Sequence, residues 1–107
     1  MLKIRLMNEY LHGPIWVLNS EGISVWKCPI VEQDHILREL NKRAMEMFNS
    51  YYEFNSHDAP CWFNAEKEKA EKDSMLNLIS QIKDRLEEID DGNFIIEDLE
   101  TERLKNL

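Results

Sequence analysis

The apolar positions near the start of the chain recur at every second residue. Ile4 and Leu6 share one face of segment 3–10, and the charged Lys3 and Arg5 occupy the other face. This alternation is typical of a β-strand with one buried side. We therefore expect an N-terminal strand that places Ile4 and Leu6 in a core.

A hairpin is expected next. The turn formers His-Gly-Pro at 12–14 interrupt the first strand, and the apolar segments 15–18 and 23–26 follow on either side of Asn-Ser-Glu-Gly. Two apolar arms around such a turn predict paired antiparallel strands. Pro29 ends the second arm because proline cannot donate a hydrogen bond to a β-ladder.

From Asp34 onward the spacing of apolar residues changes to the steps of three and four that mark a helix. Asp34 has the side chain of an N-cap, and the helix is expected to end between Asn49 and Tyr52. One apolar stripe runs along it: Leu37, Leu40, Ala44, Met47 or Phe48, and Tyr51.

A second helix follows, with Asn64 as its candidate cap. Its apolar stripe has regular helical steps: Met75, Ile79, Ile82, Leu86 and Ile89. Asp-Asp-Gly ends it, with Gly92 placed to satisfy its last carbonyl groups. The β-favouring segment 94–96 then predicts a last strand, and the tail 101–107 fits a short helix or a frayed end.

The order of elements is strand, hairpin, helix, helix, strand. This order predicts an α+β fold in which a small, mostly antiparallel sheet packs against two helices. The sheet would contain the N-terminal strand, the hairpin and the C-terminal strand. The 107 residues contain no repeat and no linker, so a single domain is expected over 1–107.

Charge limits the classes of partner. The chain has 21 acidic and 13 basic residues and a net charge of −8. Nucleic acids and anionic membranes both attract basic surfaces, so direct binding to either is disfavoured. The balance suits a basic protein partner, although ordinary solubility is the favoured explanation of it. The acids of 66–91 mostly alternate with lysines, as i,i+4 pairing on a solvated helix would produce.

Cysteine content and hydropathy address the compartment. Cys28 and Cys61 are too few for the disulfide framework of a small secreted domain. Lys3, Arg5 and Glu9 interrupt the apolar character expected of a signal peptide, and no run is long enough to cross a bilayer. A cytoplasmic protein with reduced thiols is expected.

The segment Ser-Tyr-Tyr-Glu-Phe-Asn-Ser-His-Asp-Ala-Pro-Cys-Trp-Phe-Asn at 50–64 concentrates the candidate chemistry, and we expect it to be a connection between the two helices. Ser56, His57 and Asp58 are the residue types of a hydrolytic triad, but sequence neighbours cannot point at one another as a triad requires. Cys61 with His57 or His35 is a possible thiol–imidazole pair, although its apolar neighbours favour an inert thiol.

Metal and phosphate sites have weaker support. His57, Asp58 and Cys61, with His12 from elsewhere, are potential ligands, but the paired spacings of a structural zinc site are absent. No calcium loop and no Gly-rich phosphate loop is present. No cofactor is therefore expected, and a small enzyme or metal-dependent protein using His57 and Cys61 remains an alternative.

Aromatic and acidic residues together favour protein binding. Tyrosine and tryptophan are enriched at the energetic centres of interfaces, and Tyr51 and Tyr52 would point about 100° apart on a helix, so both are not expected to be buried. Carboxylates beside them would select a basic partner. The predicted partner-binding residues are Tyr51, Tyr52, Glu53, Asp58 and Trp62.

Self-association is a third possibility. The apolar stripe of 75–89 has coiled-coil-like steps, but it extends over only two heptads or so, which is short for a coiled coil. Docking of this stripe on the chain's own sheet is the favoured use.

The N-terminal segment Ile-Arg-Leu-Met-Asn-Glu-Tyr-Leu-His-Gly-Pro-Ile-Trp-Val-Leu-Asn-Ser-Glu-Gly-Ile also resembles the opening of a set of small, acidic bacterial proteins. Some of these look like immunity proteins of polymorphic-toxin systems, which neutralise a toxin domain by binding it. The likeness covers about the first quarter of the chain and describes a strand and a hairpin. It implies a non-catalytic inhibitor that masks a basic partner such as a toxin nuclease.

Overall fold

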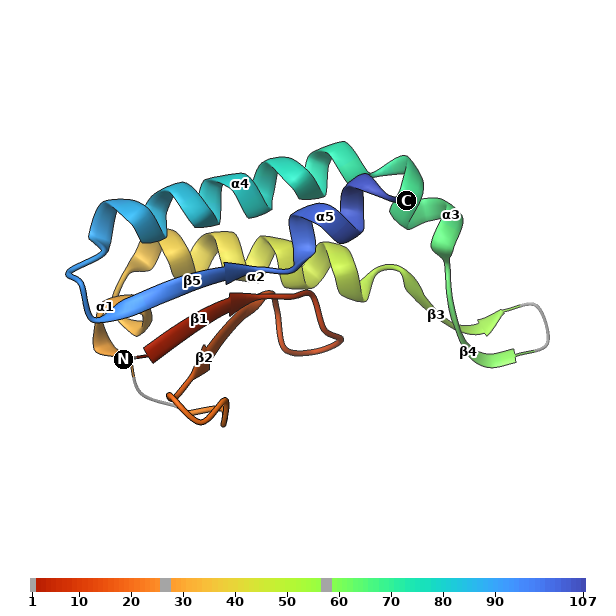
Figure 1. Cartoon of the computed structure of the whole chain (residues 1–107). Coiled ribbons are helices and arrows are strands. Elements are labelled where there is room, and N and C mark those ends of the chain that lie inside the picture. The colour runs from red at the N-terminus through yellow and green to blue at the C-terminus, as the bar shows by residue number, and fades with distance from the viewer. Residues whose placement is uncertain (1, 26–27, 57–58) are drawn as a thin grey trace.

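Two layers form the body of the molecule, a three-stranded sheet and a pair of long helices on one side of it (Figure 1). The computed structural model describes residues 2–25, 28–56 and 59–107. The strands are β1 (Leu2–Leu6), β2 (Ile15–Leu18), β3 (Tyr52–Ser56), β4 (Ala59–Phe63) and β5 (Phe94–Asp98). The helices are α1 (Pro29–Glu32), α2 (His35–Asn49), α3 (Ala65–Ala70), α4 (Lys72–Ile89) and α5 (Glu100–Lys105).

The main sheet has the strand order β2-β1-β5. β1 is antiparallel to β2 and parallel to β5, and β3 forms an antiparallel pair with β4. The predicted α+β fold with a mostly antiparallel sheet on helices is confirmed. The parallel position of β5 follows from its connection, because α4 carries the chain back along the sheet before β5 begins.

The alternation predicted for β1 decides which face of the sheet meets the helices. Ile4 and Leu6 are fully buried, while Lys3 and Arg5 lie on the opposite face and pair with Glu97 of β5. The helical stripes supply the other half of the core. The buried residues of α2 and α4 are Leu37, Leu40, Ala44, Phe48, Met75, Leu78, Ile79, Ile82 and Leu86.

The predicted second hairpin arm at 23–26 is not a strand in the described residues. It still returns beside β2: the amide of Val25 donates to the carbonyl of Val17, and an isolated bridge joins Ser24 to Leu18. The side chain of Asn19 shapes the turn between them by accepting hydrogen bonds from the amides of Glu21 and Ile23. Trp26 lies outside the described residues. Pro29 begins α1, where its missing amide proton has no cost.

Two further differences concern the middle of the chain. The connection expected at 50–64 contains the β3–β4 hairpin, whose two strands pair antiparallel. The helix expected from Asn64 onward is divided into α3 and α4 at Glu71. Both N-cap predictions are confirmed, since Asp34 accepts from the amide of Leu37 and Asn64 accepts from the amide of Lys67.

Asp34 also joins the two long helices, and this link makes stability depend on pH. Arg85 of α4 donates to Asp34 Oδ2 from Nη2 at 2.6 Å, and chiefly this bond lowers the pKa of Asp34 below its ordinary value of 3.8. A carboxyl whose pKa is lowered on folding stabilises the fold above its unfolded pKa. That contribution is lost as the pH falls through the folded pKa.

We expect Asp34→Asn to lower the free energy of unfolding by about 1–2 kcal/mol at pH 7, because asparagine keeps the cap and loses the ion pair. The difference from the wild type should begin to shrink below pH 3.8, where Asp34 of the unfolded wild type takes up a proton, and should be lost once the pH falls below the lowered pKa of the folded state. Urea denaturation at pH 7 and pH 3 measures both values. Equal stability of the two proteins at pH 7 would show that the pair contributes nothing.

Candidate functional site

The β3–β4 hairpin extends away from the two layers at the end of α2 (Figure 1). Its register pairs Tyr52 with Phe63, Glu53 with Trp62, and Phe54 with Cys61. Among the described strands, β3 and β4 pair only with each other. A hairpin of two strands is marginally stable alone, so its base must be held by side chains of the body.

Aromatic rings hold that base. Tyr52 and Phe63 each have a ring centroid 5.8 Å from that of Phe48, which is buried in α2. The rings of Tyr52 and Phe63 are 5.0 Å apart at a steep angle. Edge-to-face contacts of this kind add to the area that aromatic residues bury. The base of the hairpin is therefore part of the core.

Farther along the hairpin the same face is exposed. Tyr10, from the loop between β1 and β2, lies 4.5 Å from Tyr52 and 6.4 Å from Phe54, measured between ring centroids. Phe54 is 54% exposed and Leu11 is 69% exposed, and Cys61 is exposed opposite Phe54. We call Tyr10, Leu11, Tyr52, Phe54 and Cys61 the hairpin patch. Exposed apolar patches of this kind mark interaction sites.

Leu11 is held in an uncommon backbone conformation within this patch. Its φ of +63° lies in the left-handed region, which a non-glycine residue adopts at some cost in energy. The side chain of Asn49 compensates by accepting a hydrogen bond from the amide of Leu11 at 2.9 Å. The loop is thereby fixed with the largest apolar side chain of its tip facing solvent.

One carboxylate borders the hairpin patch, and a second lies on the opposite face of the hairpin. Glu9 precedes Tyr10 of the patch, and its Oε1 accepts a hydrogen bond from the Tyr10 amide at 3.1 Å. Burial raises the pKa of Tyr52, and the charge of Glu9 raises it further. Glu53 points to the other face of the hairpin, where it accepts a hydrogen bond from Asn64 Nδ2 at 2.6 Å. Asn64 is the N-cap of α3, so Glu53 also orients the start of that helix.

The predicted partner-binding residues lie in different environments. Tyr52, Glu53 and Trp62 are partly exposed on the hairpin, whereas Asp58 lies outside the described residues. The prediction for Tyr51 is wrong, because this side chain is fully buried. α2 ends at Asn49, and the turn at Ser50 directs Tyr51 into the core while Tyr52 begins β3.

Four members of the patch were not predicted as binding residues: Tyr10, Leu11, Phe54 and Cys61. Tyr52 and Phe54 have the i, i+2 spacing of residues on one face of a strand, and this signal was present in the sequence. No local pattern indicates that Tyr10 and Leu11 join them. Their position depends on the loop after β1 meeting a hairpin some forty residues away in the chain.

A second cluster of polar residues is buried where α3, α5 and the end of β1 meet. The carboxylates of Glu68 and Glu100 are 3% and 1% exposed. Arg103 donates to both, with Nη2 2.7 Å from Glu68 Oε2 and Nε 2.9 Å from Glu100 Oε2. Asn8 donates to Glu100 from its backbone amide and from Nδ2. The hydrogen bond from Arg103 to Glu100, and to a smaller extent the one to Glu68, raises the pKa of Arg103.

This cluster connects the hairpin to the body and offers little to a substrate. Its two carboxylates are covered by protein and engaged by Arg103 and Asn8. α3 directly follows β4, so fixing Glu68 fixes the side of the hairpin from which the chain leaves. The cluster therefore serves as a structural clamp, by which we mean buried ion pairs and hydrogen bonds that hold α3, α5 and the end of β1 together.

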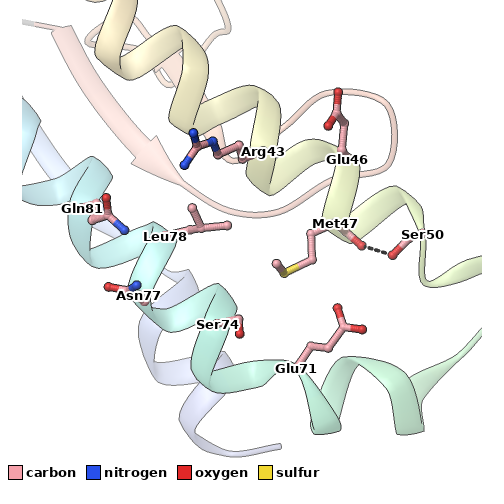
Figure 2. A pocket seen from close by; sticks show the side chains of 9 residues that line it. All are labelled: Arg43, Glu46, Met47, Ser50, Glu71, Ser74, Asn77, Leu78 and Gln81. Carbon is pink, nitrogen blue, oxygen red and sulfur yellow. Dashed lines mark hydrogen bonds between the residues drawn. The ribbon is translucent and has the colours of Figure 1, made fainter.

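A groove of about 620 Å³ lies between α2 and α4 (Figure 2). Met47 reaches from α2 toward Leu78, and polar side chains from both helices surround this apolar floor. Ser50 Oγ donates to the carbonyl of Met47, and Glu71 accepts from the hydroxyl of Tyr51. The described lining residues include no histidine, cysteine or lysine, and the hydroxyl of Ser50 is engaged by the backbone.

The alternatives based on cysteine and histidine have no assembled site in the described part of the chain. Cys28 is buried and Cys61 is exposed on β4, while His57 lies outside the residues described. The imidazole of His12 is stacked on the indole of Trp16, with centroids 3.6 Å apart. In the residues that were searched, no three side chains of His, Cys, Asp or Glu are placed to hold a metal ion.

No protein-family model, curated protein or solved structure matches this chain. None of the helices in the described residues combines the length and apolar character needed to cross a membrane. The functional proposal rests instead on the exposed side chains of the hairpin patch.

Proposed function

We propose that this protein binds another protein through the hairpin patch and has no catalytic activity of its own. The observation that carries the proposal is Phe54, a large aromatic side chain that is 54% exposed on a projecting hairpin and lies against Tyr10. Aromatic residues at the centre of an interface contribute much of the binding energy. Their exposure in the free protein is consistent with burial against a partner.

Charge favours a basic partner. The chain has a net charge of −8. Glu9 lies beside the patch, and Glu53 lies on the opposite face of the hairpin. Opposite charge accelerates association and selects among partners. In its concrete form, the proposal is an immunity-type inhibitor that covers a basic toxin domain such as a nuclease.

The test is capture of the partner with patch variants, followed by reconstitution. The tagged protein is incubated with lysate of its native host at low and moderate salt, and retained proteins are identified by mass spectrometry. The proposal is supported if one basic protein is retained in an equimolar amount with the tagged protein and is released as the salt concentration rises. The purified pair must then form the same complex, and a nuclease partner must lose activity in it.

We expect Leu11→Asn with Phe54→Ser to weaken binding of that partner roughly 30-fold or more, about 2 kcal/mol, because both side chains lose apolar contact area. Asparagine suits the left-handed conformation of residue 11, and both positions are exposed, so the free energy of unfolding should change by less than about 1 kcal/mol. Calorimetric titration measures the affinity.

Ile36→Ser is the matched control. Ile36 is 41% exposed, but it lies in the first turn of α2, at the opposite end of that helix from β3. The control should bind like the wild type. Equal weakening by Ile36→Ser, or full binding by the patch variant, would contradict a role for the hairpin patch.

A further inference from the structure

The hairpin also has unpaired backbone groups along its edges. In the described part of the chain, β3 and β4 form a sheet of only two strands, so each has one row of amide and carbonyl groups without a β-partner. Such an edge is a template for another strand. Proteins often protect edges with charged side chains, yet β4 has the sequence Ala-Pro-Cys-Trp-Phe and carries no charge.

The alternation of the ladder identifies the groups on the outer edge of β4. The amide of Asn64 donates to the carbonyl of Tyr51 at 2.6 Å, and in an antiparallel ladder every second pair is bonded in this way. The backbone groups of Trp62 then face β3, and those of Cys61 and Phe63 face outward. Pro60 has no amide proton, but by the same alternation its nitrogen faces β3.

The two faces of the hairpin differ in chemistry. Phe54 and Cys61 are paired on one face, and Glu53 and Trp62 are paired on the other. A strand added beside β4 would place alternate side chains on these two faces. Apolar residues suit the first face. Arginine or lysine suits the second, where a carboxylate attracts a cation and an indole can hold it through a cation–π contact.

We propose that β4 accepts an extended basic segment of the partner as a third strand, in which arginine or lysine alternates with apolar residues. This inference rests on the proposed function and specifies how the partner is held. Main-chain hydrogen bonds to Cys61 and Phe63 supply affinity, and the alternating side chains supply selectivity. The net charge of −8 favours such a segment over a second copy of this acidic chain.

The test uses a synthetic seven-residue peptide in which arginine and valine alternate, titrated into ¹⁵N-labelled protein. Saturable shifts are expected at the amides of Cys61 and Phe63. A peptide with glutamate in place of arginine should bind at least roughly tenfold more weakly. A peptide of the same composition with the arginines in one block should also bind more weakly, because it cannot divide its side chains between the two faces.

Two variants of Cys61 measure how much the outer edge of β4 contributes to binding of the peptide. Cys61→Pro removes one outward amide and leaves the bonds to β3 in place, so binding of the alternating peptide should weaken roughly tenfold. Cys61→Val keeps that amide and an apolar side chain, so its binding should weaken far less than that of Cys61→Pro. The proposal is overturned by equal binding of these two variants or of the alternating and block peptides, by shifts confined to other elements, or by no saturable shift.

The outcomes also separate this inference from the proposed function. A captured partner that is lost with Leu11→Asn/Phe54→Ser but retained with Cys61→Pro would support docking on the face and exclude strand addition. Sedimentation of the protein alone gives one more result. A dimer that Cys61→Pro dissociates would make a second copy the occupant of the edge and overturn the basic-segment proposal.

Discussion

Replacing Arg103 by alanine is expected to lower the free energy of unfolding by about 3 kcal/mol. The reason is that Glu68 and Glu100 are 3% and 1% exposed and both depend on this guanidinium for their charge balance. Two carboxylates without a cation would remain buried beside each other. Arg103 is itself 40% exposed, so water screens part of the interaction, and the loss should fall at the low end for buried pairs.

Arg85→Ala is the matched control for this experiment. Arg85 is 28% exposed and pairs with one buried carboxylate, that of Asp34, so its removal should cost less than removal of Arg103. A triple variant, Glu68→Gln/Glu100→Gln/Arg103→Met, removes all the charges together. It should be more stable than Arg103→Ala, because no uncompensated charge stays buried.

Urea denaturation at pH 7 gives the free energy of unfolding of each variant. A loss of less than about 1 kcal/mol at pH 7 would mean that the two glutamates are solvated after Arg103 is removed, and that the cluster is not a clamp.

Periodicity made the main layers of this fold predictable. The alternation around Ile4 and Leu6 and the helical stripe that includes Ile79 and Ile82 reflect burial of one face, and all four residues are fully buried. The caps at Asp34 and Asn64 were predictable because each depends on a bond only three residues long in sequence. Features that depend on local chemistry are readable without tertiary information.

The sequence did not predict the β3–β4 hairpin, because the side chains on one of its faces are buried at the base of the hairpin and exposed farther along it. Tyr52 and Phe63 pack on the core while Phe54 and Cys61, on the same face, are exposed. A single face that is buried at one end and exposed at the other gives no clear alternation of apolar and polar residues. The helical stripe before it also extends to Tyr51 in sequence, which favours continuing α2 beyond its actual end.

The buried charge cluster could not be predicted for a different reason. Glu68 lies among acids and lysines at 66–72 that read as a solvated helix face, and these neighbours are indeed exposed or only partly buried. Its burial depends on Arg103, 35 residues away, and on the return of the chain through β5 to α5. Pairing at this separation leaves no trace in local periodicity.

Tyr51→Ala should have the largest effect on stability, a loss of about 3–5 kcal/mol, because it empties a fully buried site in the core. The ring of Tyr51 packs edge-on against Phe48 and Phe63, with centroids 5.9 and 6.0 Å apart. Those two residues also support Tyr52 at the base of the hairpin. The cavity would therefore loosen the attachment of the hairpin patch as well as the core.

Tyr51→Phe separates packing from hydrogen bonding. It keeps the ring and loses only the hydroxyl, which donates to Glu71 at 3.4 Å, a long bond, so the free energy of unfolding should change by less than about 1 kcal/mol. Both variants can be measured by urea denaturation and by partner binding. If Tyr51 were a contact residue, Tyr51→Ala would weaken binding with little loss of stability. If Tyr51 is a core residue, Tyr51→Phe should bind the partner normally. Tyr51→Ala should then lose affinity only to the extent that it unfolds.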